Sequence, residues 1–210
     1  MPSFETVLIF IGATMALLVV PGPAVVYIVT RSVAQGRAAG LVSVVGIHVG
    51  SIVYVLLTSL GMSALLLASS TAFEIVKWLG VAYLVWLGIQ KLWLQRTDDG
   101  SVEEPPDMSK KRIFAQGVLV NVLNPKTLVF FVAFLPQFVD PARGGVAGQL
   151  LFFGIGFIVL GIISDGSYAL LASALSGRLR RTAKARRRLD LSSGMIYLLL
   201  GAVAATVSQS

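Results

Sequence analysis

Cysteine is absent from the 210 residues, and histidine occurs once, at His48. Without cysteine the chain can form no disulfide, no thiolate metal site and no cysteine nucleophile. A single histidine also excludes a multi-histidine zinc or iron site within one chain. We therefore expect neither a metal ion nor a cofactor.

Charged residues are also scarce. They make up 13% of the chain, whereas hydrophobic residues make up 56%. Soluble domains typically carry about 25% charged residues, so water is not the only solvent of this protein. The net charge of +7 would suggest a nucleic-acid partner in a soluble protein. In a membrane protein the placement of the charges matters more than their sum, and we expect a lipid bilayer and no nucleic acid as partners.

Long apolar stretches fill most of the sequence. Each is long enough for the roughly 20 residues that a membrane-spanning helix needs, and charge, glycine or proline separates each from the next. The stretches are 4–29, 41–68, 73–94, 113–139, 146–175 and 191–207. Because the backbone must satisfy its own hydrogen bonds in lipid, we expect an all-α, polytopic membrane protein with six transmembrane helices.

The charged residues predict how this protein lies in the membrane. All of the 17 Lys and Arg residues except Lys77, Lys126 and Arg143 fall in the first, third and fifth connections or, in the case of Lys91, at the flank of the third. The positive-inside rule therefore predicts that these connections are cytoplasmic and that both termini are extracytoplasmic, in a cytoplasmic (inner) membrane. The start of the chain has no Lys or Arg before its first apolar run, so we expect no cleaved secretory signal.

The sequence also divides into two similar halves. The polar segment 95–112 predicts a cytoplasmic linker between a first three-helix repeat, 1–94, and a second, 113–210. Gly80-x-x-Tyr83-Leu84 in the third stretch matches Gly194-x-x-Tyr197-Leu198 in the sixth. Since each half has an odd number of helices, the second half must insert upside down, which is the inverted-repeat plan of many secondary transporters.

Prolines interrupt the first and fourth stretches. Pro21-Gly22-Pro23 and Asn124-Pro125 predict breaks in helices 1 and 4, with Asn124 as the cap of the new helix. Both breaks lie ~15–20 Å from the cytoplasmic boundary at ~1.5 Å per residue, near the membrane centre. Broken ends there present polar backbone groups that suit a carboxylate, although ordinary proline kinks are the alternative interpretation.

Lys126 and Asp165 are the charges deepest in apolar sequence. Each costs at least ~2.5–3.5 kcal/mol there, so something must compensate it. Lys126 would attract a substrate carboxylate, and Asp165 would attract an ammonium group or take up a proton. The alternative is that the two residues only pair with each other.

Other polar residues lie near these positions. His48 is a second candidate for proton coupling, with a packed, hydrogen-bonded histidine as the alternative. Asn121 and Tyr168 share helix faces with Asn124 and Asp165, so they could bind substrate or join helices. The residues predicted to bind substrate are Pro21, Gly22, Pro23, Asn121, Asn124, Pro125, Lys126, Asp165 and Tyr168.

These motifs resemble those of the LysE/RhtB family of amino-acid exporters. The resemblance covers nearly the whole chain and depends mainly on Pro21-Gly22-Pro23 and on Asn124-Pro125-Lys126-Thr127. Further matches are Gly36-Arg37-x-x-Gly40, Gly46-x-x-x-Gly50 and Leu135-Pro136-Gln137-Phe138. The resemblance implies export of amino acids from the cytoplasm, driven by the proton-motive force.

Several alternatives stay open at this point. The resemblance implies either a basic amino acid or a neutral one such as homoserine, threonine or leucine as the substrate. With Asp165 as the one deep acid, the neutral class is favoured, and another small solute is a further alternative. A channel and an intramembrane enzyme are less favoured, because neither a ring of charges nor a nucleophile motif is evident. The sequence leaves homo-oligomerisation open.

Overall fold

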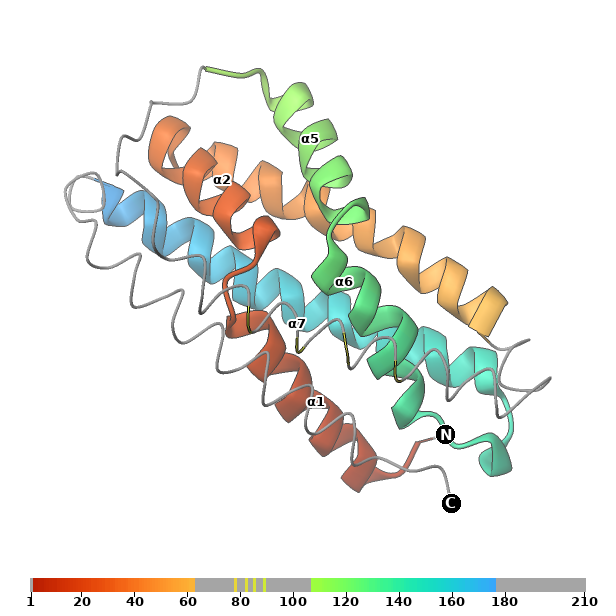
Figure 1. The fold of residues 1–210 in the computed structure, drawn as a ribbon. Helices are drawn as coiled ribbons and strands as arrows, with labels where there is room; N and C mark the ends of the chain where they lie inside the picture. Colours follow the sequence, from red (N-terminus) through yellow and green to blue (C-terminus); the bar gives the residue numbers. More distant parts are fainter. Residues whose placement is uncertain are drawn as a thin grey trace.

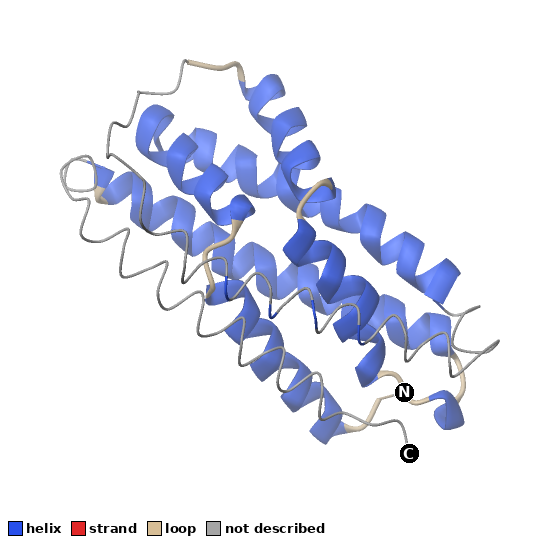
Figure 2. Cartoon of the chain, in the orientation of Figure 1, coloured by secondary structure: helices blue, strands red, loops and turns tan. Residues whose placement is uncertain are grey.

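The computed structural model describes residues 2–62, 78, 82, 85, 89 and 107–176. The predicted helices 73–94 and 191–207, most of the linker and the basic segment 178–188 therefore lie outside the described residues. Within the described part the chain is helical and has no strand (Figure 2). By length and composition, two helical stretches could cross a membrane: Val146–Ala174, and Pro23–Gly61, which includes a non-helical residue at Gly36.

The first predicted span, residues 4–29, contains one whole helix and the start of a second. Helix α1 runs over Phe4–Val19, and helix α2 over Pro23–Leu57. Ser3 caps α1 by accepting a hydrogen bond from the Thr6 amide at 3.1 Å. Between the two helices the chain is extended at Val20 and Gly22, and Pro23 starts α2 at the position where its missing N–H costs nothing. The predicted break in helix 1 is therefore present.

Helix α2 turns back on itself at Gly36. This glycine has φ 79° and ψ −179°, a conformation that other residues rarely adopt. A side chain at Gly40 would overlap Ser32, although eight residues of a straight helix would place these positions about 12 Å apart. Residues 23–35 and 37–57 are thus two arms of a helical hairpin, here called the first and second arms (Figure 1).

The tight turn differs from the predicted connection between residues 29 and 41. The helix continues to Gln35 and restarts after Gly36, because a single glycine is enough to reverse the chain. Arg31, predicted to lie in a loop, is instead buried on the first arm, with its guanidinium 5.7 Å from the centre of the Tyr27 ring. The side chain of Gln35 reaches the Met108 carbonyl at 2.9 Å.

The fourth predicted span is also broken. Helix α5, Lys110–Val122, and the helical segment Pro125–Phe138, which begins with α6, Pro125–Val129, meet at an angle of 49°. If this bent pair is one span, three described segments can cross a membrane. Helix α5 runs from the opposite end of the molecule to α1, so the first halves of the two broken spans approach each other from opposite directions (Figure 1).

Close contacts hold α5 against the second arm of α2. A side chain at Gly46 would overlap the Phe114 carbonyl, and one at Gly50 would lie 2.9 Å from the Val118 carbonyl oxygen. From the other side, a Cβ atom added at Gly117 would lie only 3.0 Å from the Ser43 carbonyl oxygen. The close packing predicted from Gly46-x-x-x-Gly50 is therefore confirmed, and it brings the two backbones into contact.

An aromatic cluster joins α1, the helical segment after the second break and α7, which spans Val146–Ala174. The ring centres of Phe10 and Phe153 are 4.7 Å apart, and those of Phe130 and Phe157 are 4.5 Å apart. Large apolar side chains such as Leu41 and Val45 on α2 and Ile155 and Ile163 on α7 face outward. Outward apolar faces around an aromatic core are typical of a protein surrounded by lipid.

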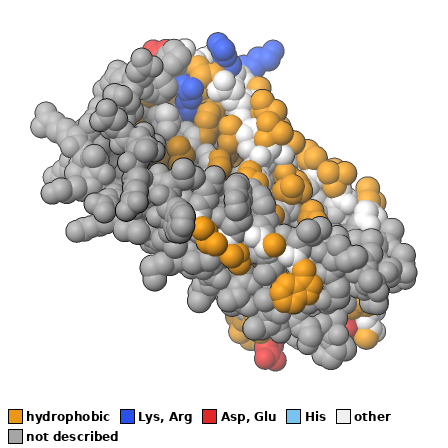
Figure 3. Space-filling view, viewed as in Figure 1, with side chains coloured by type: hydrophobic (Ala, Val, Ile, Leu, Met, Phe, Trp, Pro, Cys, Tyr) orange, Lys and Arg blue, Asp and Glu red, His pale blue; other side chains and the backbone are white. Residues whose placement is uncertain are grey.

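Charged side chains gather at the ends of the described structure. Lys110, Lys111 and Arg112 are exposed where α5 begins, and blue side chains mark this end in the space-filling view (Figure 3). Hydrophobic side chains cover much of the described surface between the ends on this face. A polar end and an apolar middle are what a membrane-spanning bundle requires.

Candidate functional site: a pocket between two broken helices

The broken end of α1 contacts the second half of the chain. The last turn of a helix leaves carbonyl groups without helical partners, and here two of them accept bonds from distant side chains. The Lys126 Nζ atom donates to the Val20 carbonyl at 2.6 Å, and the Tyr168 hydroxyl donates to the Val19 carbonyl at 2.7 Å. These contacts, across 106 and 149 residues of sequence, bring the two breaks together.

The second break is held by asparagines on its two sides. Asn124 caps α6 as predicted, because its side-chain oxygen accepts a hydrogen bond from the Lys126 amide at 3.1 Å. Asn121, before the break, accepts from the Thr127 hydroxyl at 3.0 Å and donates to the Ser51 hydroxyl at 2.9 Å. Asn121 thus joins α5, α6 and α2 and sets the angle between the two half-helices.

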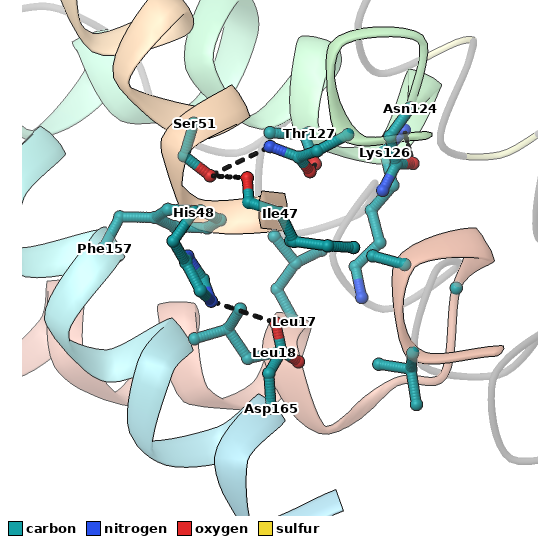
Figure 4. A pocket seen from close by; sticks show the side chains of 14 residues that line it. Leu17, Leu18, Ile47, His48, Ser51, Asn124, Lys126, Thr127, Phe157 and Asp165 are labelled. Atoms are coloured by element: carbon teal, nitrogen blue, oxygen red, sulfur yellow. Dashed lines mark hydrogen bonds and ion pairs between the residues drawn. The ribbon is translucent and has the colours of Figure 1, made fainter. Parts of the chain in front are cut away.

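A pocket lies between the two breaks (Figure 4). Its polar lining comes from His48, Ser51, Asn121, Asn124, Lys126, Thr127 and Asp165. Its other lining residues are Leu17, Leu18, Gly22, Ala24, Val25, Ile47 and Phe157. Polar groups on one side and aliphatic or aromatic groups on the other are typical of a site for a small amphipathic ligand.

The charged residues of the pocket have different partners. Asp165 is 4% exposed, and its Oδ2 atom lies 3.1 Å from the Nε2 atom of His48, which is also 4% exposed. Lys126 is 8% exposed and bonds the backbone of α1. Within the described residues no ion pair joins Lys126 to Asp165, so the predicted alternative of a mutual pair is not what the structure contains.

Hydrogen-bonding capacity remains on several pocket atoms. The Asn124 Nδ2 and Asp165 Oδ1 atoms have no hydrogen-bond partner among the described residues, and Lys126 uses one of its three donors. The Nδ1 atom of His48 is buried and likewise unpartnered in this part of the chain. The pocket therefore presents two kinds of donor and one carboxylate oxygen to a ligand.

The structure places only some of the predicted residues in the pocket. Gly22, Asn121, Asn124, Lys126, Asp165 and His48 line it. The three prolines shape the breaks without lining the pocket, and Tyr168 lies outside the lining with its hydroxyl on Val19. No three His, Asp or Glu side chains gather anywhere in the described ranges.

Sequence reasoning did not assign several lining residues to the site. Ser51 and Thr127 had a usable signal, because Ser51 lies one helical turn after His48 and Thr127 ends the Asn-Pro-Lys-Thr motif. Phe157, Leu17 and Ile47 had none, since an apolar residue in an apolar helix looks the same whether it faces lipid or a pocket.

The chain matches a family of translocators and a relative that is named a membrane protein. The family described as LysE type translocator matches residues 15–208 of the chain. A relative from Vibrio cholerae, named an uncharacterized membrane protein, is 34% identical over 186 residues, which are 89% of each chain.

Two further relatives have names that state an activity. The homoserine/homoserine lactone efflux protein of Salmonella typhimurium is 31% identical over 97% of this chain and 98% of its own length. The leucine efflux protein of Enterobacter sp. (strain 638) is 25% identical over 95% of this chain and 93% of its own length. No solved structure matches the chain.

Proposed function

Since this chain belongs to the LysE-type translocator family and is therefore a transporter rather than an enzyme, we propose that it exports neutral amino acids from the cytoplasm. The names of the homoserine/homoserine lactone and leucine efflux relatives support this substrate class. The observation that carries the proposal is that Lys126 and Asp165, a cation and an acid buried in apolar helices, line one pocket between two broken spans.

The pocket groups match the parts of a zwitterionic amino acid. The carboxylate would bind the Lys126 Nζ atom and the unpartnered Asn124 amide, both of which belong to the second break. The ammonium group would bind the Asp165 Oδ1 atom. The apolar lining, including Leu17 and Phe157, would then contact the substrate side chain.

A neutral substrate fits the charges better than a basic one. Asp165 is the one acid in the described pocket lining, and His48 already contacts one of its oxygens. A second ammonium or guanidinium group would therefore enter a largely apolar space without a carboxylate partner. A buried, unpaired cation is strongly unfavourable, so lysine and arginine would bind weakly.

We further propose that the His48–Asp165 pair couples export to protons. The two side chains are in contact, buried and adjacent to the substrate groups. A proton bound by this pair would reduce the attraction of Asp165 for the substrate ammonium. Substrate release and proton uptake would then be linked at one carboxylate, which is the exchange that a proton-driven exporter needs.

The arrangement of the whole protein is part of the proposal. Residues 1–94 and 113–210 would form two inverted three-helix repeats joined by the cytoplasmic linker 95–112, with both termini outside. The opposite directions of α1 and α5 toward the pocket support this plan (Figure 1).

Transport by inside-out vesicles tests the proposal. Exported amino acids should accumulate inside these vesicles against a gradient when a pH gradient is applied, with labelled homoserine, threonine and leucine preferred over lysine. Lys126→Gln should weaken substrate binding by at least about 30-fold, since removing one partner of a buried charged contact costs ~2 kcal/mol or more. Asp165→Asn should abolish pH-driven accumulation while the protein remains in the membrane.

Asp140→Asn is the matched control, because Asp140 is an acid in the connection before α7 and does not line the pocket. It should transport as the wild type does. Full pH-driven transport by Asp165→Asn would contradict the coupling role, and accumulation of none of these amino acids by the wild type would contradict the proposed function itself.

A further inference from the structure

The two breaks share one structural feature, a tyrosine hydroxyl on the last carbonyl of the first half-helix. At the first break Tyr168 donates to Val19, the last residue of α1, at 2.7 Å. At the second break Tyr54 donates to Val122, the last residue of α5, at 2.6 Å. In each case the bond satisfies a carbonyl that the break deprives of a helical partner.

The two bonds are reciprocal between the halves of the chain. Tyr54 lies on the second arm of α2, in the first half of the chain, and its hydroxyl donates to the carbonyl at the break in the second half. Tyr168 lies on α7, in the second half of the chain, and its hydroxyl donates to the carbonyl at the break in the first half. Each tyrosine also follows a pocket residue by three positions: Tyr54 follows Ser51, and Tyr168 follows Asp165. Residues three apart lie on one helix face, so each of these faces carries both a pocket residue and the tyrosine that bonds a break.

From this arrangement we propose that Tyr54 and Tyr168 are paired positioning residues that control access to the pocket from opposite sides of the membrane. The inference deepens the proposed function and rests on the chain being a transporter with this pocket. While its tyrosine bond is made, each half-helix is held in place at the pocket. When the bond opens, the half-helix on that side can move, and the pocket opens toward that side.

The positions of the half-helices explain why the two tyrosine bonds act on opposite sides of the pocket. Helix α1 and helix α5 reach the pocket from opposite ends of the molecule (Figure 1). Loosening the Tyr168 bond therefore frees α1 on one side, whereas loosening the Tyr54 bond frees α5 on the other. An unpaired carbonyl is costly in a lipid environment, so each bond should be remade when its half-helix returns.

The absence of cysteine makes a direct test available. Ala24→Cys places the chain's one thiol in the pocket lining. Its reaction with a membrane-impermeant maleimide is measured in right-side-out and in inside-out vesicles, and the ratio of the two rates reports which side the pocket faces. Tyr168→Phe and Tyr54→Phe remove only a hydroxyl each, and phenylalanine keeps the stacking of residue 54 on Phe131, whose ring centres are 5.7 Å apart.

We expect Tyr168→Phe to raise the labelling rate from the α1 side, and Tyr54→Phe to raise it from the α5 side. Each ratio should change by at least about threefold, which corresponds to the loss of one ordinary hydrogen bond. The matched control is Tyr27→Phe, which removes a bond from a tyrosine hydroxyl to the Ile113 carbonyl at 2.8 Å. This carbonyl lies near the start of α5, nine residues before the last residue of that helix, and not at a break. Its ratio should equal that of the parent.

Two Phe variants with the parental ratio would overturn the proposal, as would a shift of both ratios toward the same side. Loss of the Tyr54→Phe and Tyr168→Phe proteins from the membrane, with normal amounts of Tyr27→Phe, would also overturn it by assigning the bonds to stability alone. The labelling needs no substrate. A shift of the ratios in opposite directions, without transport of any amino acid, would therefore leave this inference intact and contradict the proposed function.

Discussion

At position 161, on α7, a side chain of any size would occupy space that the His48 imidazole fills. A Cβ atom there would overlap the Cε1 atom of the ring and lie 3.1 Å from its Nε2 atom. Gly161 is one helical turn before Asp165, so the ring rests on the backbone of α7 while its Nε2 atom reaches the carboxylate at 3.1 Å. The pair therefore depends on the lack of a side chain at this position.

We predict that Gly161→Ala displaces His48 from Asp165 and changes the pH dependence of export. Because His48 is the only histidine, imidazole ¹⁵N signals of histidine-labelled protein report this residue alone, provided that no histidine tag is used. These signals should shift in Gly161→Ala. They should not shift in Gly148→Ala, which makes the same change on the same helix with nothing within 4 Å.

A double-mutant cycle separates this effect from general damage to α7. In a His48→Ala background there is no ring to displace, so adding Gly161→Ala should have little further effect on export. Independent, additive losses from the two substitutions would show that Gly161 does not act through His48.

Among the elements, α2 depends most visibly on one backbone conformation. The hairpin between its arms requires φ 79° at Gly36, and side-chain-bearing residues held in such conformations cost ~1–3 kcal/mol. The hairpin also fixes where the second arm, with His48 and Ser51, lies relative to the first break. Strain at the turn would therefore affect both the stability and the pocket.

Gly36→Ala is predicted to lower the unfolding temperature of the purified protein in detergent by several degrees, since ~1 kcal/mol corresponds to ~2–4 °C in a chain of this size. Gly12→Ala serves as the control, because Gly12 lies within α1 with ordinary helical geometry and open space around it. That change should leave the temperature unchanged or raise it slightly, through higher helix propensity. Equal temperatures for the two variants would contradict the assigned role of the turn.

At the scale of the whole molecule, the distribution of charge predicts its orientation. The exposed cations Lys110, Lys111 and Arg112 begin α5 at one end, whereas the exposed Glu5 lies near the start of α1 at the other. Cationic ends face the cytoplasm in most membrane proteins, so α1 should begin outside.

Single cysteines test this orientation in the cysteine-free background. We expect Glu5→Cys to react with a membrane-impermeant maleimide in intact spheroplasts, and Lys111→Cys to react only after the membrane is permeabilised. The reverse pattern would invert the proposed direction of the repeats. Labelling of both positions in intact spheroplasts would mean that α1 and the start of α5 lie on the same side.

Much of the fold was predictable from local features of the sequence. Apolar length indicated the helices, Pro21, Pro23 and Pro125 indicated the breaks, and Asn124 indicated the cap, because each acts on its own neighbours in the chain. The family resemblance predicted from these motifs is confirmed. The sequence also indicated that Lys126 and Asp165 needed compensation, since a charge in an apolar helix is costly wherever the helix lies.

Only the tertiary structure decided how those charges are compensated. The sequence alone could not show that His48 contacts Asp165 across 117 residues or that Lys126 bonds the end of α1. Nor could it show that Tyr54 and Tyr168 each bond a carbonyl at the break in the other half of the chain. The physical reason is that helix type and breaks depend on neighbouring residues, whereas these contacts depend on how helices distant in sequence turn toward one another when they pack.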